Sequence, residues 1–309
     1  MRKSIEWLFS LLGMVISFLY LAFVLNPIQV LSMLIYPISP KLCRRINRWC
    51  ARSIWGWWAL MAERQNRIDV RITGDKVPFQ ENVFVTSNHQ SVADIMVMLC
   101  FAWRCGRIGD MKWFVKDILK WIPGPGWGMV MLDCIFLKRN WARDKQDVLD
   151  LFSKFKRHDI PVFLVSFLEG TRATPKKLAQ SQAYAQANGL PVPQATLVPR
   201  TKGFVATMQG LGDHLDAVYD ISMGYPDGVP SFVDCFLRKV RRVDIHVTRH
   251  PIESFDMTDE ALSDWVFARY REKDALMVDY KAQGQFPGER AYGPIYVSDY
   301  FKPESRVRH

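Results

Sequence analysis

The sequence lacks the cysteine and histidine clusters that hold a structural metal ion or a disulfide framework. It contains no Cys-x-x-Cys pair and no cysteine with a histidine at metal-ligand spacing. Secreted disulfide scaffolds and zinc modules are therefore excluded, and we expect no metal site. We expect six reduced, buried thiols in a protein whose folded part is in the cytosol: Cys43, Cys50, Cys100, Cys105, Cys134 and Cys235.

Motifs for nucleotide phosphates and for serine nucleophiles are also missing. The chain has no Gly-x-Gly-x-x-Gly and no Walker loop, which argues against dinucleotide-binding and P-loop enzymes. It has no Gly-x-Ser-x-Gly elbow either. If the protein is a group-transfer enzyme, its nucleophile should therefore come from the substrate.

Charge is nearly absent from one long stretch near the N-terminus. Between Ile5 and Ile38 the only charged residue is Glu6. The part before Asn26-Pro27 is already long enough to cross a hydrocarbon core of about 30 Å, so we expect residues 1–40 to be a membrane anchor. Because Asn26-Pro27 should interrupt the helix, two arrangements are open: a single span with an interfacial continuation, or a helical hairpin that enters and leaves on one side.

Basic residues outnumber acidic ones, giving a formal net charge of +10. Such a balance suits a lipid surface, a phosphorylated substrate or nucleic acid. No nucleic-acid fold signature accompanies the basic cluster at residues 238–242, so we expect no nucleic acid partner. More positive charge follows the anchor than precedes it, which predicts a cytoplasmic domain, with the bacterial inner membrane as the expected location. The following basic residues are Lys41, Arg44, Arg45, Arg48 and Arg52.

Residues 41–67 repeat apolar side chains at spacings of three and four, with arginines between them. This pattern predicts an amphipathic helix in the headgroup layer, with tryptophans at its boundary. The alternative is an ordinary domain helix with one apolar face.

Strand and helix patterns alternate after residue 68, which predicts an α/β fold with a mixed sheet flanked by helices over residues 68–283. Residues 284–309 are rich in glycine, proline and aromatic residues, and we expect an irregular tail packed on the domain or the membrane. The expected strands are 70–73, 83–86, 112–116, 134–137, 161–168, 195–198, 216–223 and 243–248.

A histidine stands where one predicted strand gives way to a helix. Val83 to Thr86 has the pattern of a buried strand, and Ser91 can cap the apolar helix that runs from Val92 to Trp103. His89 lies between them, at the kind of sheet edge where ligands bind. Asp94, five residues later, can fold back onto the imidazole, fix its tautomer and leave its other nitrogen as a base. This base would activate a substrate hydroxyl for attack on a carbonyl, which is acyl transfer.

The spacing alone is a weak signal because 31 residues are acidic. It gains weight from a second polar stretch at a strand end, residues 167–172. Arg172 there, together with Lys116 and Arg139 at other strand ends, could converge on the same edge and bind a phosphate. The alternative for Arg172 is a surface salt bridge with Glu169.

Several blocks in this order resemble the glycerolipid acyltransferases, the PlsC-like 1-acyl-sn-glycerol-3-phosphate acyltransferases. The similarity covers about residues 68–212, and the apolar N-terminus also fits. Leu168 departs from the family pattern, which has proline there, and residues 139–144 and 199–203 look more like the larger eukaryotic-type branch. The blocks are Asn88–Asp94, Lys116–Pro123, Ile135–Arg139, Glu169-Gly170-Thr171-Arg172 and Val198–Gly203.

The resemblance implies a membrane-bound enzyme that moves a fatty acyl group from acyl-CoA or acyl-carrier protein to the sn-2 hydroxyl of lysophosphatidic acid. It implies that His89 is the base and that Asp94 orients it, without a cofactor. The acceptor phosphate and its loop would be held by Lys116, Arg139, Glu169, Gly170, Thr171 and Arg172. Two alternatives stay open: an acyltransferase for another lysophospholipid, and a non-catalytic basic membrane-anchored binding protein.

Overall fold

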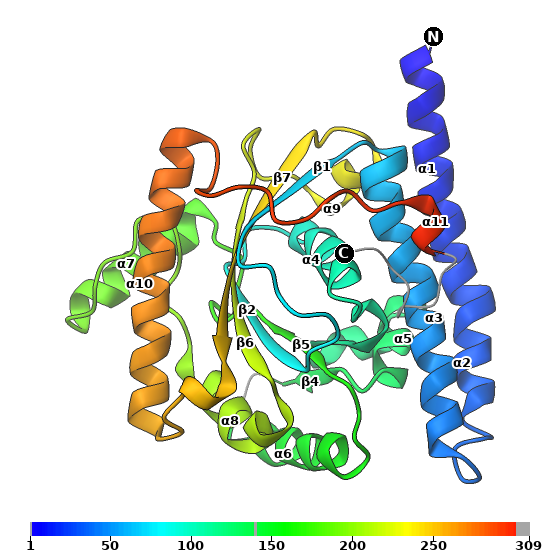
Figure 1. The fold of residues 1–309 in the computed structure, drawn as a ribbon, viewed down its shortest axis with the longest axis horizontal. Coiled ribbons are helices and arrows are strands. Elements are labelled where there is room, and N and C mark those ends of the chain that lie inside the picture. Colours follow the sequence, from blue (N-terminus) through cyan, green and yellow to red (C-terminus); the bar gives the residue numbers. More distant parts are fainter. Residues whose placement is uncertain (1, 139–140, 301–309) are drawn as a thin grey trace.

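The computed structural model describes residues 2–138 and 141–300. Seven strands form one sheet in the order β1-β7-β6-β2-β5-β3-β4 (Figure 1). Every neighbouring pair is parallel except β6 and β7, so the predicted mixed α/β sheet is confirmed. The strands are β1 (Asp69–Gly74), β2 (Val83–Ser87), β3 (Met111–Lys116), β4 (Ile135–Leu137), β5 (Phe163–Ser166), β6 (Ala217–Gly224) and β7 (Arg242–Pro251).

The central strand β2 is buried along its whole length. Val83 and Val85 point into the core on one face of the sheet, and Phe84 points into the core on the other face. This alternation follows from the two-residue period of a strand. Because β2 is parallel to both β5 and β6, the three strands end at the same edge of the sheet. The turn that carries His89 lies at this edge.

Helices cover both faces of the sheet (Figure 1). The face that carries Phe84 is covered by α6 (Trp141–Arg157), α8 (Thr201–Leu211) and α10 (Asp259–Gln283). Helix α7 (Pro175–Ala187) is largely exposed. The face that carries Val83 and Val85 is covered by α3 (Pro40–Leu60), α4 (Ala93–Arg104) and α9 (Phe232–Phe236). Shorter helices are α5 (Pro125–Met131), α11 (Val297–Tyr300), η3 (Ile108–Asp110), η4 (Asp117–Trp121), η5 (Gly212–His214) and η6 (Ile252–Ser254).

The N-terminal helix is not broken at Asn26-Pro27, so that prediction is wrong. Helix α1 (Arg2–Tyr20) continues through a π-helical turn, η1 (Leu21–Leu25), into α2 (Asn26–Ser32). A proline ring crowds the carbonyl four residues earlier in an α-helix. The wider turn accommodates Pro27, and the Asn26 amide donates to the Leu21 carbonyl. Within the described residues, the stretch Glu6–Ser32 is long and apolar enough to cross a membrane.

The chain then turns and returns as α3, which runs antiparallel to α1 and α2 (Figure 1). Polar contacts tie the two arms of this helical hairpin: Trp58 Nε1 donates to Ser17 Oγ at 2.9 Å, and Ser10 Oγ donates to Asn66 at 2.8 Å. Helix α3 extends through a second π-helical turn, η2 (Met61–Gln65), and packs its apolar face on α4. Trp49 and Trp57 stay exposed on its other side.

The predicted strand at residues 195–198 is wrong. The backbone amides of Ala195 and Thr196 both donate to Asp274 Oδ1 on α10, each at 2.8 Å. These amides are satisfied by a carboxylate and have no neighbouring strand, so the segment is irregular.

The tail from residue 284 packs on the domain as far as it is described. Its anchor is the buried ion pair between Arg104 on α4 and Glu63 on η2, whose closest atoms are 2.6 Å apart. Arg104 Nε donates to the Gly293 carbonyl at 3.0 Å, and Glu63 Oε2 accepts from the Ile295 amide at 3.0 Å. One ion pair therefore joins the helical hairpin, α4 and the tail.

We predict that Arg104→Ala lowers stability by about 3–5 kcal/mol, because it leaves the Glu63 carboxylate buried without its partner. The control is Lys156→Ala, which removes a surface pair with Asp213 and should cost about 1 kcal/mol or less. Thermal unfolding in detergent measures both variants. Equal unfolding temperatures for the two would contradict a structural role for the buried pair.

Candidate active site

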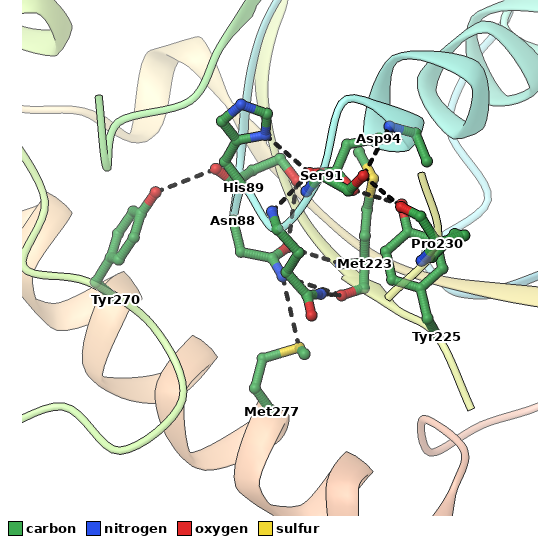
Figure 2. Close-up of polar contacts among 12 residues, drawn as sticks. Asn88, His89, Ser91, Asp94, Met223, Tyr225, Pro230, Tyr270 and Met277 are labelled. Atoms are coloured by element: carbon green, nitrogen blue, oxygen red, sulfur yellow. Dashed lines mark hydrogen bonds and ion pairs between the residues drawn. The ribbon is translucent and has the colours of Figure 1, made fainter. Parts of the chain in front are cut away.

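His89 lies in the turn between β2 and α4, and its ring contacts the predicted acid. His89 Nδ1 is 2.8 Å from Asp94 Oδ2, with the Asp94 side chain fully buried and 18% of the His89 side chain exposed (Figure 2). The structure thus brings together the two residues that the sequence paired.

Asp94 is held by four donors. Besides the imidazole, Oδ2 accepts from the backbone amides of Gln90 at 2.7 Å and Ser91 at 3.0 Å. The other oxygen, Oδ1, accepts from the hydroxyl of Tyr225. A buried carboxylate needs such donors, since desolvation without them is costly.

The N-terminal cap of α4 differs in detail from the predicted cap by Ser91. The helix begins at Ala93, and Asp94 accepts the free amides that precede it. Ser91 Oγ accepts from the Ala93 amide at 3.2 Å, and its hydroxyl donates to the Pro230 carbonyl. Folding Asp94 back over its own turn therefore both orders the helix start and places an acceptor beside His89.

The imidazole is fixed on its face as well as its edge. His89 stacks on Phe167, which follows β5, with ring centroids 4.0 Å apart and planes 15° apart. With Nδ1–H donated to Asp94, Nε2 is left as an acceptor. No hydrogen bond joins Nε2 to a described residue, and Figure 2 shows it on the side of the ring away from Asp94. This arrangement allows Nε2 to accept a proton.

Asn88 was not among the predicted site residues, but it anchors the same turn to β6. Its side-chain amide donates to the Met223 carbonyl at 3.0 Å and accepts from the Met223 amide at 2.8 Å. Gln90 Nε2 donates to the same carbonyl at 2.7 Å. The turn that carries His89 is therefore fixed to β6 on both sides of the histidine.

The loop after β5 closes over the histidine backbone. The Ala173 amide donates to the His89 carbonyl at 2.7 Å, which places Arg172 directly beside the turn. Gly170 has φ of +67°, and an added Cβ would lie 3.0 Å from Arg200 Nε. Glycine therefore allows both the left-handed turn and the passage of Arg200 over it. Arg200 is a further basic residue at this edge that the predicted site omitted.

Glu169 is buried, and its carboxylate makes no well-formed hydrogen bond to the described residues. Burial raises the pKa of Glu169 well above its usual value, although the backbone amide of His89 and the charge of Lys273 partly offset this. Arg172 is exposed, and no ion pair joins it to Glu169 among the described residues. The salt bridge considered for Arg172 is therefore not present in the structure.

The remaining predicted residues that the structure describes lie at or near the same edge. Lys116 ends β3, is exposed and is paired with Leu137 of β4. Thr171 is half-buried in the loop. Arg139 lies outside the described residues. Within the described ranges, no three His, Cys, Asp or Glu side chains are grouped closely enough to hold a metal ion.

Two family descriptions match the sequence: acyltransferase over residues 69–225 and acyltransferase C-terminus over residues 234–305. The chain belongs to the acyltransferase family. This confirms the resemblance found in the sequence motifs, since the first match contains His89, Asp94 and Arg172.

Relatives with similar sequences include 1-acyl-sn-glycerol-3-phosphate acyltransferase 2 of Arabidopsis thaliana, 31% identical over 84% of this chain and 69% of the relative. The human 1-acyl-sn-glycerol-3-phosphate acyltransferase gamma is 29% identical over 86% of this chain and 72% of its own. The crystal structure of the LPA acyltransferase PlsC from Thermotoga maritima matches 92% of this chain and 99% of its own with a TM-score of 0.55. At 19% identity, that likeness supports the fold alone.

We predict that Tyr225→Phe lowers both stability and acyltransfer activity. The variant leaves Asp94 Oδ1 buried without its hydroxyl donor, a loss of about 1–3 kcal/mol. Tyr219→Phe is a matched control, because the buried Tyr219 donates to Glu81 at 2.6 Å, and Glu81 precedes β2 whereas His89 follows it. Both variants should lower the unfolding temperature, but only Tyr225→Phe should lower kcat. An unchanged kcat in folded Tyr225→Phe would exclude a role for this hydroxyl in orienting Asp94.

Proposed function

We propose that this protein transfers a fatty acyl group from acyl-CoA or acyl-carrier protein to the sn-2 hydroxyl of lysophosphatidic acid, giving phosphatidic acid. The observation that carries the proposal is the imidazole of His89 at the carboxyl edge of the sheet, fixed by Asp94 and Phe167, with no described residue hydrogen-bonded to Nε2. The names of the relatives support the reaction and the acceptor.

The reaction follows from this geometry. His89 Nε2 removes the proton from the acceptor hydroxyl as its oxygen attacks the thioester carbonyl. The tetrahedral intermediate then collapses, the carbon–sulfur bond breaks, and the imidazolium returns its proton to the departing thiolate. Asp94 stabilises the imidazolium between these steps and keeps the ring in one orientation. No enzyme nucleophile is required.

Binding of the acceptor phosphate is assigned to the basic residues of the edge. Arg172 is exposed beside the histidine turn, and its planar guanidinium can form two parallel hydrogen bonds with a phosphate. Lys116 and Arg139 are further phosphate ligands in this proposal. Burial raises the pKa of Glu169 above its usual value, and with Gly170 and Thr171 this side chain shapes the loop in this proposal.

We further propose that the helical hairpin holds the protein on a membrane, with the domain in the cytoplasm of a bacterial cell. One side of the N-terminal helix packs on the rest of the protein from Ser10 to Asn26, while Phe23 is 75% exposed on another side. An upright helix would draw the polar elements beside it into hydrocarbon. We therefore place the hairpin along the membrane surface, with its exposed apolar side chains in the lipid.

We predict that His89→Ala lowers kcat by about 10² to 10⁴, because a positioned base contributes a factor of this size. The purified protein is assayed with lysophosphatidic acid and with a panel of other lysophospholipids, using both acyl-CoA and acyl-carrier protein donors. Lys177→Ala, an exposed change on α7, is the control and should keep full activity. Wild-type turnover by folded His89→Ala would refute the mechanism, and a preference for another lysolipid would refute the acceptor.

We predict that Arg172→Ala raises KM for lysophosphatidic acid at least tenfold, since a lost charged hydrogen bond costs about 1.5–3 kcal/mol. Arg172→Lys should recover part of the loss, because an ammonium lacks the planar fork. KM for the thioester donor should change much less. If donor KM rises and acceptor KM does not, Arg172 belongs to the donor site.

A further inference from the structure

A cluster of large apolar side chains is exposed on the catalytic domain, more than eighty residues after the N-terminal helix. Trp121 is 69% exposed and Ile118 is 66% exposed, and three further side chains beside them are also exposed. We call this cluster on η4 and α5 the apolar shelf: Ile118, Trp121, Ile122, Trp127 and Val130. Contiguous exposed apolar surface of this kind marks an interaction site.

The shelf is attached rigidly to the N-terminal helix. The Gly124 amide donates to Asn26 Oδ1 at 2.8 Å, and Asn26 Nδ2 donates to Gln29 at 3.0 Å. Both polar side chains are buried in a helix whose residues are mostly apolar. Helix α5 lies against α2, and a Cβ at Gly128 would be in van der Waals contact with Gln29 Oε1 at 3.7 Å.

Basic residues border the shelf. Lys120 Nζ pairs with Asp117 at 2.8 Å and lies 5.4 Å from the centre of the Trp121 ring. Tryptophan with lysine beside it is the composition of a bilayer interface, where the ring lies among the headgroups and the ammonium meets anionic lipid.

We propose that the apolar shelf is a second membrane contact, occupied by the interfacial layer of a lipid bilayer. The proposal rests on the membrane location given above, and it is favoured over a protein partner because the shelf adjoins the exposed apolar side of the N-terminal helix. Helix η4 begins directly after Lys116, at the strand edge that carries His89. The shelf therefore holds this edge against the lipid surface, so that an acceptor lipid reaches His89 without leaving the membrane.

The first test measures lipid contact directly. Because all six native cysteines are buried, single cysteines introduced as Trp121→Cys, Phe23→Cys and Tyr184→Cys can be labelled with the fluorophore NBD. The unsubstituted protein is carried through the same labelling as a blank. In vesicles of phosphatidylcholine and phosphatidylglycerol, we expect blue-shifted emission at positions 121 and 23, quenched by doxyl-labelled lipid. Tyr184, which is exposed on α7, should give emission like that in water.

The outcomes separate the two proposals. Quenching at position 23 without quenching at position 121 overturns the shelf and leaves the membrane anchor standing. Quenching at neither position overturns the anchor itself. A blue shift at position 121 that depends on protein density and resists doxyl lipid means that a second copy of the chain covers the shelf, which also overturns the proposal.

A second test uses activity. The double variant Ile118→Asp/Trp121→Asp should lower turnover of a long-chain acceptor presented in vesicles by about tenfold, because burial of both side chains in lipid is lost. Turnover of a short-chain, monomeric acceptor should stay unchanged, which controls for folding and chemistry. Tyr184→Asp should change neither. Equal turnover of the vesicle-bound acceptor by the double variant and the unsubstituted protein would overturn the proposal.

Discussion

The buried carboxylate of Asp94 is the interaction on which the rest of the site depends. A charge at zero exposure is stable only if several donors face it. Here they come from the histidine, from two amides ahead of α4, and from Tyr225 beyond β6. The same contacts that satisfy the charge fix the strand-to-helix turn. Orientation of the imidazole and stability of the helix start therefore have one physical cause.

The sheet supplies the second constraint. Because β5, β2 and β6 are parallel neighbours, the residues after their last hydrogen bonds meet at one edge. Phe167 after β5 then stacks on His89 after β2, and Met223 near the end of β6 pairs with the Asn88 amide. Parallel order thus brings three distant segments together to support the His89 ring, whose Nε2 has no hydrogen-bond partner among the described residues.

Sequence reasoning could locate His89 and Asp94, because their contact is local and the patterns of β2 and α4 are strong. It could not find Tyr225, since nothing near Tyr225 in the sequence marks its contact with a residue more than one hundred positions away. The predicted strand at residues 195–198 failed for a related reason: its propensity was overridden by Asp274, a tertiary partner on α10. In both cases a hydrogen bond to a residue distant in sequence determines the structure, and the local sequence pattern does not show that partner.

The N-terminal helix shows that amino-acid composition alone does not predict which side of a helix is buried. Its hydropathy describes a uniform apolar rod, yet Ser10, Ser17 and Asn26 are buried against the protein and hydrogen-bonded, while large apolar side chains face outward. The inward side of the helix therefore carries polar side chains together with Leu21 and Leu25, and the outward side carries large apolar side chains. The proposed membrane contact would give these outer side chains an apolar medium. In the proposed arrangement the apolar shelf extends this apolar surface onto the catalytic domain, next to the sheet edge that carries His89.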